Sequence, residues 1–239
     1  MDTHLHHTSH HSEEHFKQSD LVRDIVIGVS DGLTVPFALA AGLSGAVNDN
    51  HIILTAGLAE IIAGSIAMGL GGYLAGKTEV EHYDSELARE YRETVTHYET
   101  ERHEVMAILG HYGLSKSSQE IVMNEMEKDT DKWVEFMMRF ELGLEKPDPD
   151  RARKSAMNIG LSYVAGGIIP LSAYLFTNSP KDGLLYSSII TITCLMAFGY
   201  FKSKATGQRP LKGAIRTTII GVIAAGAAYL LASVISSNG

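Results

Sequence analysis

The sequence predicts an all-α polytopic membrane protein with five transmembrane helices and a cytosolic helical insert between spans 2 and 3. Three observations predict this fold class: charged residues are segregated, five apolar stretches have the length of a membrane span, and the loops differ in Lys and Arg content. Whole-chain averages do not indicate a membrane protein, because 45% hydrophobic residues and a net charge of −8 would also suit an acidic soluble protein. The distribution along the chain therefore decides the fold class.

Charged residues concentrate in one segment of the chain. Thr78–Asp150 contains 19 Asp and Glu against 8 Lys and Arg, whereas three later stretches contain no charged side chain: Ser155–Pro180, Gly183–Phe201 and Thr217–Gly239. This acidic balance argues against nucleic acid as a partner. The single cysteine, Cys194, lies in an apolar run, which argues against a disulfide framework and a thiolate metal cluster.

Five stretches are long enough to span a membrane, because a helix that crosses ~30 Å of hydrocarbon needs about 20 apolar residues. They are Asp24–Val47, Ile52–Gly76, Ala156–Thr177, Leu184–Phe201 and Ala214–Val234. Two of them contain a proline, which membrane helices tolerate when neighbours satisfy the freed carbonyl groups. The second span also carries small residues four apart, a pattern that lets helices pack closely: Ala59, Ala63, Ala67 and Gly71.

The orientation of the spans follows from the basic residues of the loops. Residues 48–51 and 178–182 hold at most one Lys or Arg, whereas residues 202–212 hold four. Since cytosolic loops are enriched in Lys and Arg, we expect the N-terminus and the insert to be cytosolic and the C-terminus to lie on the other side. No cleavable signal peptide opens the chain, so the first span is expected to direct its own insertion.

The domain organisation follows from the same distribution. Residues 1–20 are predicted to form a disordered cytosolic tail that holds six of the eleven histidines, which suits either weak metal capture or a merely solvated segment. Residues 21–76 hold the first two spans, residues 77–150 a cytosolic, carboxylate-rich domain, and residues 151–239 the last three spans.

The insert is predicted to be helical. The second span is expected to continue into the first insert helix as one rod, because no helix breaker occurs between Gly76 and Arg92. A break is expected at the β-branched residues near Thr94–Thr96. Gly113 and the serines that follow predict a stop and a new start, and a further helical stretch is expected over Gln119–Leu144.

Two acidic residues lie within predicted spans. A carboxylate at membrane depth costs at least ~2.5 kcal/mol unless it is paired, hydrated or metal-bound, so Asp31 and Glu60 are candidates for an ion or proton path. At 1.5 Å per residue, Asp31 and Met68 reach nearly the same depth, with Glu60 further along the path. Carboxylate and thioether together suit Fe²⁺ better than Ca²⁺ or Mg²⁺. Local capping by Asp31, a structural hydrogen bond at Glu60 and apolar packing of Met68 remain alternatives.

The insert carries pairs of glutamates three residues apart, which share a helix face. Such pairs from neighbouring helices can converge on a metal, as in di-iron bundles. A third helix adds two acids, Glu135 and Glu141, and two thioethers, Met137 and Met138. Seven candidate ligands of the insert are carried forward: Glu90, Glu93, Glu101, Glu104, Met137, Met138 and Glu141. The same spacing also occurs on solvated acidic helices, and both interpretations stay open on spacing alone. Four histidines could join such a site but are interpreted as ordinary surface residues: His82, His97, His103 and His111.

Three motifs carry a resemblance to a known family: RDIVIGVSDGLTVPFALAAGLSG, LTAGLAEIIAGSIAMGLGGYLAGKTE and WVEFMMRFELGLEKPDP. Through them the chain resembles the vacuolar iron transporter family, related to the yeast calcium-cross-complementer group, from about Asp20 to Val234. The resemblance implies a five-span homodimer that exports Fe²⁺, and also Mn²⁺, from the cytosol in exchange for protons. The pore residues of the family fall on Asp31, Glu60 and Met68, and its cytosolic metal ligands fall on the seven insert residues named above.

The sequence thus predicts a metal transporter rather than an enzyme, with divalent metal ions, protons and the lipid bilayer as partners. Fe²⁺ is the expected substrate, Mn²⁺, Zn²⁺ or Co²⁺ are possible ones, and no organic cofactor is expected. The expected location is the inner membrane in a prokaryote or the vacuolar membrane in a eukaryote. Two alternatives stay open: a membrane-anchored ferroxidase or iron-storage module, and a metal sensor.

Overall fold

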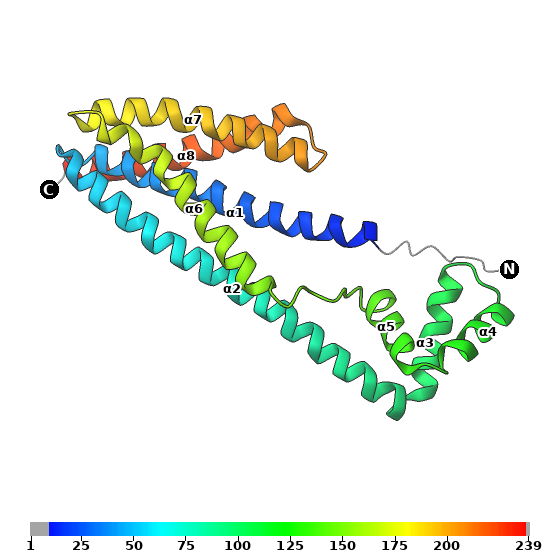
Figure 1. The fold of residues 1–239 in the computed structure, drawn as a ribbon. Helices are drawn as coiled ribbons and strands as arrows, with labels where there is room; N and C mark the ends of the chain where they lie inside the picture. Colours follow the sequence, from blue (N-terminus) through cyan, green and yellow to red (C-terminus); the bar gives the residue numbers. More distant parts are fainter. Residues whose placement is uncertain (1–9, 238–239) are drawn as a thin grey trace. The chain divides into compact units, whose positions relative to one another are not determined.

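The computed structural model describes the backbone of residues 10–237 and the side chains of residues 20–237, and this part of the chain contains helices and no strand. The helices are α1 (His10–Ser44), α2 (Asn50–Thr96), α3 (Tyr98–His111), α4 (Lys116–Met126), α5 (Thr130–Phe140), α6 (Arg151–Leu175), α7 (Pro180–Ala205) and α8 (Pro210–Ser237) (Figure 1). Five of them, α1, α2, α6, α7 and α8, are long and apolar enough to cross a membrane. The all-α class and the five candidate spans are therefore confirmed. Residues 1–9 of the predicted tail lie outside the described residues, and residues 10–20, which were expected to be disordered, form the first turns of α1.

The chain divides into two compact units. The first, here called the membrane unit, consists of Met1–Tyr73 together with Arg153–Gly239, and the second, here called the insert, is Leu74–Ala152. All five apolar stretches have most or all of their length in the membrane unit. The insert holds α3, α4, α5 and the second half of α2.

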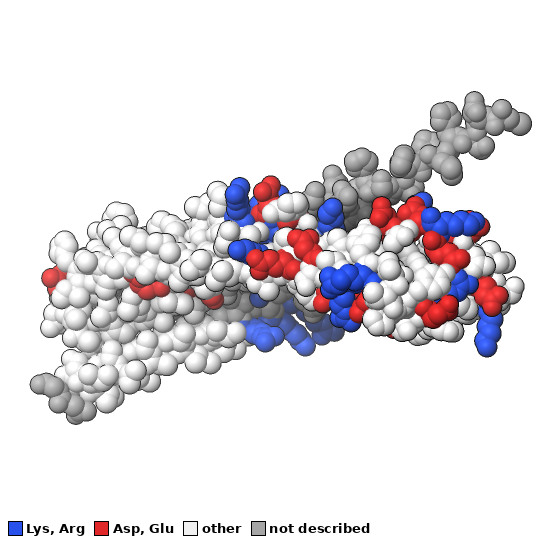
Figure 2. Space-filling model, turned by 90° about the horizontal axis from the view of Figure 1, so that it is seen from below, with Lys and Arg blue, Asp and Glu red and all other residues white. Residues whose placement is uncertain are grey.

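The membrane unit packs through small and medium-sized side chains. α8 packs against α1 and α7, and α7 and α8 lie side by side (Figure 1). One apolar cluster joins Phe37 and Ala41 of α1 to Ala225 of α8. Large apolar side chains on the outer faces stay exposed, for example Ile62, Ile66 and Ile223, as expected for helices that face lipid. Figure 2 shows a broad region of one face on which charged side chains are nearly absent.

α2 is a single helix of 47 residues that runs from the membrane unit into the insert. This confirms the expected rod, and the helix ends at Thr96, where the β-branched residues predicted a break. α3 begins at Tyr98, one residue later, after an N-cap residue, His97, whose side chain makes no capping hydrogen bond. The first candidate ligands of the insert therefore stand on a helix that starts in the membrane unit.

The insert folds around its own apolar core. Buried Val105, Leu109, Met123, Trp133 and Met137 form one cluster contributed by α3, α4 and α5. The predicted stretch Gln119–Leu144 is not continuous, because α4 ends at Met126 and α5 starts at Thr130. Asp129 explains the restart: its side chain accepts a hydrogen bond from the Lys132 N–H, 3.4 Å away, as an N-cap does. Folding back at this point lets the apolar faces of α4 and α5 share one core.

Candidate metal sites

Three glutamates of the insert converge. Glu90 comes from α2, Glu101 from α3 and Glu141 from the C-cap position of α5, and each places one carboxylate oxygen within 4.8 Å of the others. Glu90 and Glu101 are almost fully buried, at 3% and 5% exposed, while Glu141 is exposed. Among the described residues, the Oε2 atoms of Glu90 and Glu101 have no hydrogen-bond partner. Buried acceptors without a donor fit a cation at this point.

The protonation of the three glutamates reflects this crowding. Burial, followed by the charge of Glu101, raises the pKa of Glu90 to about 7. Burial and the charge of Glu104 raise the pKa values of Glu101 and Glu141 to about 7 as well. Partial loss of water and like charges both disfavour the ionised form of a carboxyl. At neutral pH the cluster thus holds protons that a divalent cation can displace.

The other four candidate ligands of the insert, Glu93, Glu104, Met137 and Met138, differ in their surroundings. Glu93 accepts a hydrogen bond from Arg89 Nε at 3.1 Å, and Glu93 and Glu104 both act electrostatically on the cluster. Met137 lies in the apolar core with Trp133, and Met138 is buried as well. The structure therefore brings together the carboxylates of Glu90, Glu101 and Glu141, and it places Met137 in the apolar core of the insert.

The four histidines of the insert are exposed, in agreement with their interpretation as surface residues: His82, His97, His103 and His111. The candidate ligands that converge here are oxygen donors. Carboxylate oxygens suit hard and borderline divalent cations such as Mn²⁺ and Fe²⁺.

In the membrane unit, Glu60 of α2 is held by a residue that the sequence interpretation missed. The hydroxyl of Tyr163, on α6, donates a hydrogen bond to Glu60 Oε1, and Glu60 Oε2 is buried without a partner among the described residues. Tyr163 is itself only 2% exposed. A signal for it existed in the sequence, because Tyr163 is the sole aromatic residue in a run of small and aliphatic ones from Ala156 to Leu171.

Two glycines let Tyr163 occupy this position. A Cβ added at Gly64, one turn after Glu60, would lie 2.5 Å from the Tyr163 hydroxyl oxygen. A Cβ added at Gly32, the residue after Asp31, would lie 2.3 Å from the Tyr163 carbonyl oxygen. Both distances are shorter than van der Waals contact, so α1 and α2 can approach α6 here only through glycine.

Asp31 and Met68 are half-buried, on α1 and α2. α1 continues through Asp31 for more than three further turns, which excludes the capping alternative for this residue. Asp31 is also within electrostatic range of Tyr163. A further buried acid, Asp24, accepts a hydrogen bond from Ser155 Oγ at 3.2 Å and was not singled out from the sequence.

Comparison with known proteins shows similarity over nearly the whole chain. A family model described as VIT family matches residues 22–233. The chain is 53% identical to vacuolar iron transporter 1 of Arabidopsis thaliana over 226 residues, which cover 95% of this chain and 90% of that protein. It is 49% identical to vacuolar iron transporter 1 of Oryza sativa subsp. japonica, over 99% of this chain and 93% of that protein. It is 37% identical to protein CCC1 of Saccharomyces cerevisiae, over 87% of this chain and 67% of that protein.

Proposed function

The chain belongs to the VIT family, and from this premise we propose that it is an iron transporter that exports Fe²⁺, and also Mn²⁺, from the cytosol in exchange for protons. The observation that carries the proposal is the half-buried Glu60, whose carboxyl is held by Tyr163 within helices apolar enough to span a membrane. Acids at membrane depth are retained where ions or protons pass.

The insert collects the metal. The supporting observation is the cluster of Glu90, Glu101 and Glu141, whose buried oxygens lack donors among the described residues. Because these carboxyls have pKa values of about 7, Fe²⁺ binds by displacing protons, and binding strengthens as the cytosol becomes more alkaline. Glu93, Glu104, Met137 and Met138 complete the proposed ligand set.

The membrane unit moves the metal. Asp31, Met68 and Glu60 act as successive metal-binding positions along the path. Metal and protons compete for the carboxylates of Asp31 and Glu60. Competition of this kind couples the two fluxes, since a carboxylate that binds Fe²⁺ must first lose its proton. Tyr163 keeps Glu60 oriented by donating to one of its oxygens.

The proposed assembly is a homodimer, with the N-terminus and the insert in the cytosol. Its support is the row of small residues on α2, Ala59, Ala63, Ala67 and Gly71, which is exposed in the single chain and would let a second copy approach closely. The proposed location is the vacuolar membrane in a eukaryote, in line with the names of the relatives, or the inner membrane in a prokaryote.

A flux assay tests the proposed function. The full chain is reconstituted in sealed vesicles, and uptake of Fe²⁺, Mn²⁺, Zn²⁺ and Co²⁺ is recorded with and without an imposed pH gradient. We expect Fe²⁺ and Mn²⁺ uptake that rises with a gradient acidic inside. Binding without uptake would instead indicate a metal sensor, and oxygen consumption with Fe²⁺ but no uptake would indicate a ferroxidase.

A further inference from the structure

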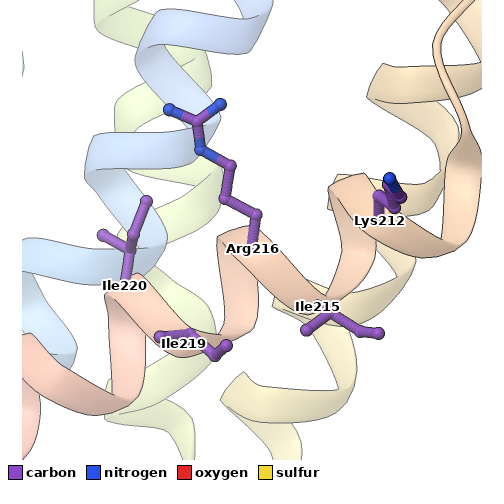
Figure 3. A pocket seen from close by; sticks show the side chains of 5 residues that line it. All are labelled: Lys212, Ile215, Arg216, Ile219 and Ile220. Carbon is purple, nitrogen blue, oxygen red and sulfur yellow. The ribbon is translucent and has the colours of Figure 1, made fainter.

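The first turns of α8 carry two cationic side chains among three exposed isoleucines. Lys212 and Arg216 are four residues apart and so share a helix face. Together with Ile215, Ile219 and Ile220 they line an open hollow of about 350 Å³ (Figure 3). All five side chains project from α8 itself.

This face of α8 points away from the helices that pack against it. The buried residues of α8 are Ala214, Gly221 and Ala225, which recur at intervals of seven and four and therefore share one side of the helix. At about 100° per residue, Lys212, Arg216 and Ile219 fall on the opposite side. The three isoleucines are 57%, 51% and 55% exposed. The hollow is thus an outer surface of the membrane unit.

The two cations have no acidic partner nearby in the sequence. No Asp or Glu occurs anywhere in residues 183–239, whereas residues 202–216 hold five Lys or Arg. Among the described residues, neither Lys212 nor Arg216 makes an ion pair. Both exposed cations are therefore available to an anionic ligand from outside the chain.

We propose that this face binds one anionic phospholipid, with its phosphate between Lys212 and Arg216 and an acyl chain along the isoleucines. The cations stand in the first turns of a helix that is long and apolar enough to span a membrane, and basic side chains near the surface of a bilayer attract anionic lipid. Guanidinium and ammonium groups both bind phosphate, the former in a bidentate manner. An anionic phospholipid supplies a negative headgroup and an apolar chain together.

Charge argues against the other occupants of the hollow. A second copy of the chain docked through the same face would oppose the same cations, and like charges brought together repel. A free phosphate would leave the three isoleucines uncovered. The inference depends on α8 crossing a membrane and not on metal transport, so it can fail while the proposed function holds.

The test measures lipid retention by the full chain. Purified protein is exchanged into nanodiscs of phosphatidylcholine with graded amounts of phosphatidylglycerol, and phosphatidylglycerol that remains bound after detergent extraction is counted by native mass spectrometry. Lys212→Gln combined with Arg216→Gln is expected to lower retention about tenfold. The control combines Lys202→Gln with Lys204→Gln, which removes two positive charges from the last turn of α7, on the other side of the α7–α8 loop. This control is expected to change retention less than twofold.

Three outcomes would overturn the proposal. Equal loss in both double variants would mean that the loop attracts anionic lipid only diffusely. Unchanged retention in the Lys212 and Arg216 variant would remove this face as a lipid site. A change in oligomeric state of that variant, at unchanged lipid retention, would assign the face to a second protein copy.

Discussion

Glu90, Glu101 and Glu141 have carboxyl groups that the fold holds close to one another, two of them buried. Their raised pKa values have a consequence for stability. Between about pH 4.5 and pH 7 the folded chain binds more protons at these positions than the unfolded chain does. Stability of the metal-free protein therefore falls as the pH rises through this window and stays low above it. A metal that replaces the protons restores the lost stability.

At pH 8 Glu101→Gln is expected to raise the free energy of unfolding of the metal-free insert by roughly 1–3 kcal/mol, because it removes one buried charge from the cluster. At pH 5 the free energy of unfolding should change little, because the carboxyl is protonated. The single tryptophan, Trp133, lies in the insert core, so its fluorescence during urea unfolding of the full chain with a chelator present reports this unit. Glu99→Gln, at an exposed position of the same helix, is the control and should leave the urea midpoints at pH 8 and at pH 5 unchanged. A midpoint of the Glu101 variant that drops at pH 8 would contradict the raised pKa.

Tyr163→Phe is expected to slow Fe²⁺ flux about tenfold, because it leaves both carboxyl oxygens of the half-buried Glu60 without a donor among the described residues. Flux in sealed vesicles measures the effect at saturating and at low Fe²⁺. Tyr186→Phe, an exposed tyrosine of α7, is the control. Equal fluxes for the two variants would remove Tyr163 from the path.

At the scale of elements, α2 links the candidate metal residues of both units, since Glu60 and Met68 stand on its first half and Glu90 and Glu93 on its second. The sequence predicted this rod because helix formers run unbroken from the apolar stretch into the charged one. It did not predict the break between α4 and α5, where Asp129 caps a new helix and the gain comes from a shared core. Tertiary packing outweighs local propensity there.

Gly64→Ala is expected to abolish transport, because the new methyl group would overlap the Tyr163 hydroxyl and force α2 away from α6. Flux per mole of monodisperse protein is the measurement. Gly226→Ala introduces the same change on α8, where the added Cβ has no neighbour within 4 Å, and should transport normally. A Gly64 variant with normal flux would show that the close approach of these helices is not required.

At the scale of the whole molecule, the Lys and Arg content of the loops predicts which side of the membrane each loop faces. Ser117→Cys places a thiol at an exposed position in the first turn of α4. This thiol should react with a membrane-impermeant maleimide only after the cells are permeabilised. Asn178→Cys, in the exposed α6–α7 loop, should react in intact cells that carry the protein in the plasma membrane. Both are made with Cys194→Ala, so that no other thiol reacts. Labelling with the reverse preference would invert the topology and the proposed direction of export.

The sequence located the acids of the candidate sites but not their surroundings. Glu60 and Asp31 stand out because carboxylates are rare in apolar stretches, and the glutamate pairs stand out by spacing. The hydrogen bond from Tyr163 depends on how α2 and α6 cross, and the convergence of Glu141 with Glu90 depends on how α5 folds back. Spacing within one helix carries no information on such contacts between helices.

The central claim is that one path carries metal one way and protons the other. Its most direct test records Fe²⁺ uptake and proton efflux at the same time, in sealed vesicles that are acidic inside. Wild-type protein and Asp182→Asn, which alters an exposed aspartate, should show both fluxes in a fixed ratio, and Asp31→Asn should lose both. Fe²⁺ uptake by the Asp31 variant at the wild-type rate, or wild-type uptake without proton efflux, would contradict the claim.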